Sequence, residues 1–144
     1  MSPTPAIAIH LTTALAALLL GPAIFWGRRG IVHGVRPSLA SQRWHRAAGH
    51  AWFTLMLLTA LSALFIRSDN LPNWHGYSAI HLLVPFTLAG LGLALLAIYR
   101  GNVAAHRRAM LGVYFGACVG AGVFTLLPGR YLGNLVWHAW LGWL

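Results

Sequence analysis

Long apolar stretches alternate with short polar ones along the chain, and this pattern predicts a helical membrane protein. Four stretches are almost wholly apolar. Each is close to the roughly 20 residues that cross a hydrocarbon layer about 30 Å thick as a helix. Polar joints rich in Gly, Pro and Asn separate them, and such residues end helices. We therefore expect transmembrane helices at 6–26, 47–66, 77–99 and 109–127.

The tail, residues 131–144, is too short to span. Trp137, Trp140 and Trp143 recur along it every three residues, which is roughly one stripe of a helix. Tryptophan is enriched where a membrane meets water, so we expect a short interfacial helix. The predicted fold class is an all-α integral membrane protein, a single domain over 1–144 with a four-helix bundle and this tail.

Composition supports the membrane assignment and excludes several chemistries. Hydrophobic residues make up 58% of the chain and charged residues 8%, with ten arginines, no lysine and one acidic residue, Asp69. A basic excess alone would suggest a nucleic-acid partner, but a groove-binding domain keeps a polar surface, so none is expected. A single carboxylate also excludes paired-carboxylate hydrolysis, acidic Mg²⁺ or Ca²⁺ sites and a carboxylate proton relay.

The arginines predict the topology. Eight of the ten lie in or beside the first and third joints. Because basic residues are retained in cytoplasmic loops, we expect these joints in the cytoplasm, both termini on the outer side, and the bacterial inner membrane as the location. The eight are Arg28, Arg29, Arg36, Arg43, Arg46, Arg100, Arg107 and Arg108.

Histidines recur in a tandem pattern. Ile-His-Leu opens the first and third helices at His10 and His81, and His-Arg precedes the apolar part of the second and fourth at His45 and His106. The chain therefore reads as a repeated helical hairpin, which brings equivalent helices diagonally together in a four-helix bundle. His10 and His81 then form an outer layer, and His45 and His106 an inner one.

Paired imidazoles at two depths indicate haem. Neutral imidazole is a good axial ligand for haem iron, and two from opposite helices can hold one macrocycle. We expect two b-type haems, one held by His10 and His81 and the other by His45 and His106. His50 is an alternative to His45, because it lies deeper in the membrane. It is about 140° around the helix, so the two cannot serve one iron together.

Arginines flank both layers. Haem propionates need cationic partners near the polar boundary. Arg46 and Arg107 are adjacent to the inner histidines, and Arg67 and Arg130 follow the outer ends of the second and fourth helices. We expect these four to meet propionates at the inner and outer levels respectively.

The expected function is transmembrane electron transfer, alone or as the membrane subunit of a redox complex that exchanges electrons with quinone. No catalytic base or nucleophile beyond histidine is evident, so an enzyme role would rest on redox chemistry alone. Two alternatives stay open. One is a cofactor-free partner-binding protein or small transporter whose histidines bond helices together. The weaker one is a copper site with Met56 and Met110. Homo-oligomer formation is also open.

Two resemblances add to this interpretation. The Ile-His-Leu and His-Arg pairs, together with RGNVAAHRRAMLGVYFGACVGAGVFTLLPGR at 100–130, resemble a bacterial family of four-helix membrane proteins known only as a domain of unknown function. That resemblance implies a fold and a location. The diagonal histidine pairs resemble, in architecture, the two-haem b-type cytochromes that exchange electrons with quinone, ascorbate or superoxide.

Overall fold

A computed structural model describes residues 4–26, 38–67, 73–75, 77–127, 131–140 and 142. The first hairpin consists of α1 (Pro5–Trp26) and α2 (Leu39–Ala63). A two-residue antiparallel pair, β1 (Asn73–Trp74) and β2 (Tyr77–Ser78), follows it.

The second hairpin begins with a 3₁₀ turn, η2 (Ala79–Leu82), and α3 (Leu83–Tyr99). The second arm of this hairpin is one continuous run of helical segments, and the tail is another. In chain order they are α4 (Val103–Val113), the π-helix η3 (Tyr114–Val119), α5 (Gly120–Thr125), α6 (Tyr131–Asn134) and the π-helix η4 (Leu135–Trp140).

Two helices begin earlier than their apolar stretches. The Ser38 hydroxyl accepts a hydrogen bond from the Ser41 amide at 3.2 Å and so caps α2. The Asn102 side chain likewise accepts from the Ala105 amide at 2.9 Å and caps α4. Such caps satisfy amides that a helix start leaves unpaired. The helices therefore start in polar sequence, before the expected positions 47 and 109.

The third helix begins later than position 77. The antiparallel strand pair includes 77–78, and the intervening turn holds His75 at φ 54°. A 3₁₀ turn then leads into α3. The tail is helical over 131–140 as expected, although Trp143 lies outside the described residues.

Three stretches in the described part of the chain are long and apolar enough to cross a membrane: Pro5–Phe25, Ile80–Tyr99 and Val103–Thr125. They correspond to the first, third and fourth expected spans. α2 has 25 residues, but arginines and histidines interrupt its apolar character. The fold is thus that of a helical membrane protein, with three clear spans.

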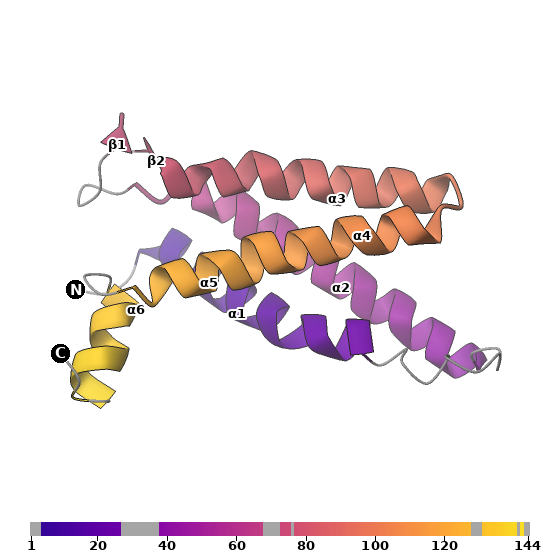
Figure 1. Cartoon of the computed structure of the whole chain (residues 1–144), viewed down its shortest axis with the longest axis horizontal. Coiled ribbons are helices and arrows are strands. Elements are labelled where there is room, and N and C mark those ends of the chain that lie inside the picture. Colours follow the sequence, from indigo (N-terminus) through magenta and orange to yellow (C-terminus); the bar gives the residue numbers. More distant parts are fainter. Residues whose placement is uncertain are drawn as a thin grey trace.

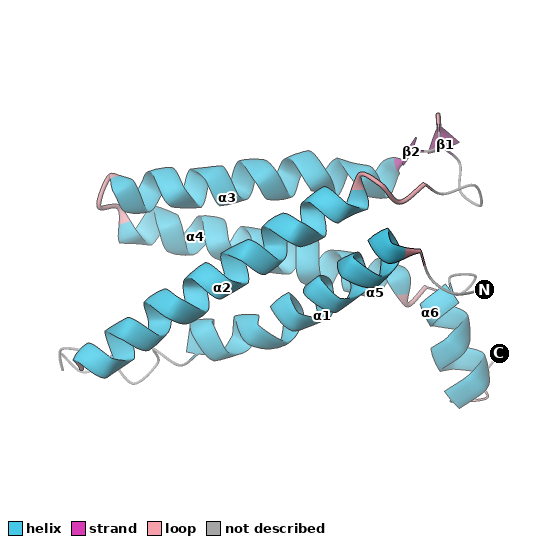
Figure 2. Ribbon diagram, turned by 180° about the vertical axis from the view of Figure 1, so that it is seen from behind, coloured by secondary structure: helices cyan, strands magenta, loops and turns pink. Residues whose placement is uncertain are grey.

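The helices pack in a ring of four neighbours. α1 lies along α2, α3 along α4, α2 contacts α3, and α1 contacts η3. Equivalent helices of the two hairpins therefore lie diagonally, as the tandem repeat predicts. Figures 1 and 2 show that α2 crosses the bundle obliquely, with its C-terminal end near the start of α3 and its N-terminal end away from the α3–α4 turn.

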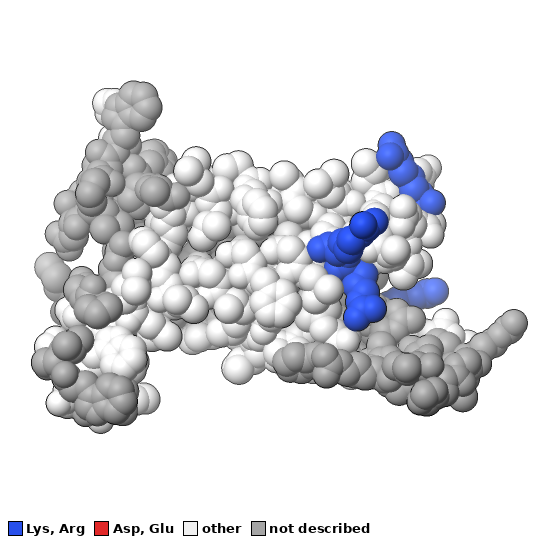
Figure 3. Space-filling model, viewed as in Figure 1, with Lys and Arg blue, Asp and Glu red and all other residues white. Residues whose placement is uncertain are grey.

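The two ends of the bundle differ in charge. The N- and C-terminal ends of the chain lie together at one end (Figure 1). The arginines visible in Figure 3 gather at the opposite end, where the α3–α4 turn and the first turns of α2 lie. This agrees with the expectation that both termini share a side, and that the arginines early in α2 share the other side with the third joint; Arg28, Arg29 and Arg36 lie outside the described residues.

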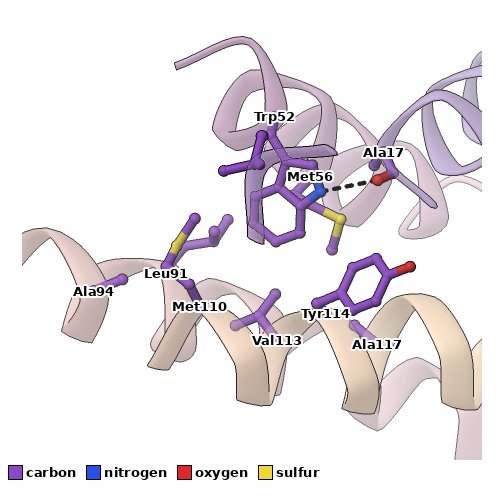
Figure 4. Packing of buried hydrophobic residues seen from close by; sticks show 10 residues of the cluster. Ala17, Trp52, Met56, Leu91, Ala94, Met110, Val113, Tyr114 and Ala117 are labelled. Carbon is purple, nitrogen blue, oxygen red and sulfur yellow. Dashed lines mark hydrogen bonds between the residues drawn. The ribbon is translucent and has the colours of Figure 1, made fainter. Parts of the chain in front are cut away.

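The middle of the bundle is a packed apolar core (Figure 4). Trp52 is completely buried, and its Nε1 donates to the Ala17 carbonyl at 2.9 Å. The Tyr114 hydroxyl donates to the Leu18 carbonyl at 3.2 Å. Gly21 makes room for the Tyr114 ring, since a Cβ there would collide with it. Two aromatic side chains thus fasten the second and fourth helical arms to α1.

Candidate functional site

The end of the first hairpin near the chain termini, which is the expected outer end, carries a polar cluster within otherwise apolar sequence. His10, in the second turn of α1, is half-buried, and its Nδ1 lies 2.9 Å from the Thr59 carbonyl oxygen and 3.3 Å from the Ser62 hydroxyl. The hydroxyls of Thr59 and Thr13 are 2.8 Å apart. We call His10, Thr13, Thr59 and Ser62 the outer polar cluster. It joins α1 to α2.

The hydrogen bond to Thr59 defines the tautomer of His10. A carbonyl oxygen only accepts, so Nδ1 of His10 carries the hydrogen and donates. In the neutral ring, Nε2 then keeps its lone pair. His10 therefore has a nitrogen available to a ligand while its other nitrogen is held by the protein.

His81 reaches the same end of α2 from the second hairpin. It lies in η2, is half-buried, and its Nε2 is 2.9 Å from the carbonyl oxygen of Ile66. Ile66 follows Ser62 by four residues and lies just past the end of α2 at Ala63. The structure thus brings both expected outer ligands to the C-terminal end of α2. The nitrogens differ, because His81 donates through Nε2 and His10 through Nδ1.

The two histidines expected at the inner level lie at the arginine-rich end. His106 is half-buried in the first turn of α4, and its Nδ1 donates to the Ala94 carbonyl of α3 at 2.9 Å. His45 is half-buried in the second turn of α2, on the helix face that carries Trp52 and Met56. Since α2 diverges from the α3–α4 turn at this end, His45 and His106 belong to separating arms (Figure 2).

His50 occupies a different face of α2 from His45. Its side chain is exposed, and its Nδ1 lies 2.6 Å from the carbonyl oxygen of Arg46, one turn earlier in the same helix. Trp52, which follows His45 by seven residues, is fully buried. Of the two alternatives, His45 is therefore the one on the core-facing side.

The flanking arginines are accessible. Arg46, Arg67 and Arg107 are exposed, whereas Arg130 lies outside the described residues. Asp69 lies outside them too, so the described part of the chain contains no side-chain carboxylate. No carboxylate in the described ranges pairs with these three guanidinium groups, and their exposure allows them to bind an external anion.

About 21 Å separates the two levels along α2, because Thr59 follows His45 by fourteen residues and each residue adds about 1.5 Å. Trp52 is halfway. Trp52, Met56, Leu91 and Val113 are the largest completely buried side chains, and they fill this middle region. A broad planar cofactor would therefore have to lie at the ends of the bundle, at the levels of the histidines.

In the part of the chain that the structure describes, no three His, Cys, Asp or Glu side chains come together. That part therefore has no clustered site for a free metal ion. Cys118 Sγ does lie 3.2 Å from Met56 Sδ, but this contact is in the apolar core, away from the histidines. Axial ligation of haem needs only two imidazoles, so that hypothesis does not require such a cluster.

Sequence reasoning missed the hydroxyl partners of His10 on α2. Thr59 and Ser62 are three residues apart and therefore share a helix face, and both lie within an apolar stretch. Thr13 has the same spacing from His10. The sequence signal for this contact was the pair of polar positions on each of two consecutive membrane helices, because polar side chains in hydrocarbon tend to hydrogen-bond to one another.

Apolar helices of spanning length, a packed apolar core and polar groups that bond between helices define a helical integral membrane protein. A family model described as "Predicted membrane protein (DUF2306)" matches residues 7–143. The chain belongs to this family, which confirms the first resemblance drawn from the sequence. Searches of the curated proteins and of the solved structures found no match.

Proposed function

We propose that this protein binds b-type haem at two levels and conducts electrons across the membrane. One observation carries the proposal. His10 and His106, at opposite ends of the bundle, each direct Nδ1 at a backbone carbonyl of the neighbouring helix, at 2.9 Å in both cases. Histidines that ligate a metal are commonly held in this way, with the second nitrogen bonded to a carbonyl or carboxylate. Nε2 of each ring is then the nitrogen that would bind haem iron.

The outer haem is assigned to His10 and His81. Both side chains reach the C-terminal end of α2, at Thr59 and Ile66. His81 directs Nε2 toward the Ile66 carbonyl, so ligation of haem through Nε2 would require its ring to leave that carbonyl. Arg67, which follows Ile66, is exposed and suited to a propionate.

The inner haem is assigned to His106 and His45, with His50 as the alternative to His45. Arg46 and Arg107 are exposed beside these histidines and provide the charge that a propionate needs. Bound haem supplies a reversible one-electron carrier. The chain's own contribution is to fix the imidazole tautomers and to exclude water between the levels with Trp52 and its neighbours.

The proposed setting is the bacterial inner membrane, with both termini outside and the arginine-rich end in the cytoplasm. Quinone is the proposed electron partner, and a redox complex is a suitable context for a subunit this small. Arg130, outside the described residues, is assigned to the outer propionates together with Arg67.

The absorbance spectrum of the protein, purified in mild detergent with haem preserved, tests the proposal. We expect a Soret band and, after reduction, an α-band. His10→Ala and His106→Ala should each remove part of the absorbance, whereas His138→Ala, at an exposed tail position, should leave it intact. A colourless preparation with native helix content would overturn haem binding.

A second candidate is a cofactor-free membrane protein that binds a partner or serves as a small transporter. It is favoured by the completeness of the outer polar cluster, in which His10 already contacts both Thr59 and Ser62. This candidate predicts a colourless protein. It also predicts that His81→Ala weakens assembly or alters the pH response without any spectral effect.

A further inference from the structure

A cavity of about 460 Å³ lies at the α3–α4 connection, between the last turns of α3 and the first turns of α4. None of the proposed haem ligands lines it. Its wall includes apolar side chains on both helices and two arginines. The lining residues include Leu93, Leu96, Ala97, Arg100, Asn102 and Arg108.

The charge of this cavity is purely positive. Arg100 and Arg108 are both exposed, and the described part of the chain contains no carboxylate to neutralise them. The polar side chain of Asn102 is already engaged, since it accepts the Ala105 amide at 2.9 Å as the cap of α4. Both guanidinium groups are therefore able to bind an external anion.

The cavity also extends from polar to apolar surroundings. Leu93 precedes Arg100 by seven residues, which is about 10 Å along α3. Leu93 and Leu96 are exposed apolar side chains, in a helix of spanning length, so they lie at hydrocarbon depth while the arginines lie at the boundary. A ligand complementary to this wall has an anionic head and an apolar chain.

We propose that this cavity binds one anionic phospholipid, with the phosphate on Arg100 and Arg108 and the first part of an acyl chain along Leu93 and Leu96. Basic pockets between membrane helices at the cytoplasmic side bind lipid headgroups in this way, and guanidinium matches phosphate geometry with paired hydrogen bonds. The proposal is independent of haem binding.

Native mass spectrometry of the full chain in neutral detergent tests it, with titrations of phosphatidylglycerol and phosphatidylcholine. We expect tighter binding of phosphatidylglycerol. Removing both charges by Arg100→Gln and Arg108→Gln should weaken that binding about thirtyfold. Arg43→Gln is the matched control, because Arg43 is an exposed arginine of α2 that does not line the cavity.

Ala97→Phe tests the site with its charge unchanged, so neither topology nor net charge complicates the result. It fills the cavity and should abolish lipid retention. Equal weakening by Arg43→Gln, or normal binding by the Ala97→Phe protein, would overturn the proposal. Millimolar inorganic phosphate is the last control. If phosphate displaces the lipid and binds the Ala97→Phe protein as tightly as the wild type, the site binds free anions, and the lipid proposal is overturned.

Discussion

His10 Nδ1 lies 2.9 Å from the carbonyl oxygen of Thr59 and so bonds the first helix to the second near the end that carries both chain termini. The second hairpin has the same type of bond at the opposite end, from His106 to Ala94. Each hairpin is thus closed by one imidazole. The arrangement fixes both tautomers and leaves one nitrogen of each ring for other chemistry.

Loss of the His10 bond should measurably loosen the first hairpin. Hydrogen bonds between membrane helices contribute on average about 0.6 kcal/mol and at most about 1.7 kcal/mol. We expect His10→Ala to lower the free energy of unfolding of the haem-free protein by about 1 kcal/mol, measured by denaturant titration in mixed micelles. Thr12→Ala is the control, since the Thr12 hydroxyl bonds only within α1. Equal losses in both variants would show that the bond to Thr59 does not stabilise the hairpin.

The core prediction concerns Trp52, which is fully buried and donates to Ala17. Trp52→Ala should cost about 3–5 kcal/mol through the cavity it leaves. Trp52→Phe keeps most of the ring and leaves the Ala17 carbonyl without this donor, so it should cost about 1–3 kcal/mol. Thermal unfolding followed by circular dichroism measures both. Trp44→Ala, at a position 51% exposed, should change little, and a loss as large as that of Trp52→Ala would contradict the packing described.

Two neighbouring glycines of α3 should respond in opposite directions to alanine. A Cβ at Gly90 would collide with Val113 of α4, whereas a Cβ at Gly92 would meet open space. Gly90→Ala should therefore separate α3 from α4 and lower the unfolding temperature. Gly92→Ala should raise it slightly, because alanine favours helix over glycine by about 0.5–1 kcal/mol. The same sign of change at both sites would be inconsistent with the close α3–α4 contact.

The proposed topology predicts which positions an impermeant thiol reagent reaches. In a Cys118→Ala background, Thr4→Cys at the terminal end and Val103→Cys at the arginine-rich end each supply a single exposed cysteine position. Labelling of intact spheroplasts with a charged maleimide should modify position 4 directly and position 103 only after permeabilisation. The reverse pattern would place the arginine-rich end outside.

Much of the fold follows from the sequence because apolar runs of spanning length have few alternatives in a membrane. The expected span 6–26 and α1, Pro5–Trp26, differ by one residue. The start of α2 was missed because apolar residues indicate which part of a helix lies in the membrane, whereas the helix itself starts at the Ser38 cap. The π-helical turn at 114–119 has no local signature; it accompanies packing of Tyr114 onto α1.

The levels at which the histidines lie were predictable, but their contacts were not. Helical position alone places His10 and His81 at one end, and both do contact the C-terminal end of α2. Their partners Thr59 and Ile66 depend on how α1 and η2 are rotated against α2. α1 is apolar on nearly every face, so periodicity cannot fix that rotation.

The most direct test of the account is the number of haem b groups per chain, determined as the pyridine haemochrome of protein whose concentration is measured independently. Two per chain are expected for the wild type. One is expected after His10→Ala, which should lose the outer haem, and one after His106→Ala, which should lose the inner haem. A folded wild-type protein with no haem, or one whose haem content is unchanged by both substitutions, would contradict the account.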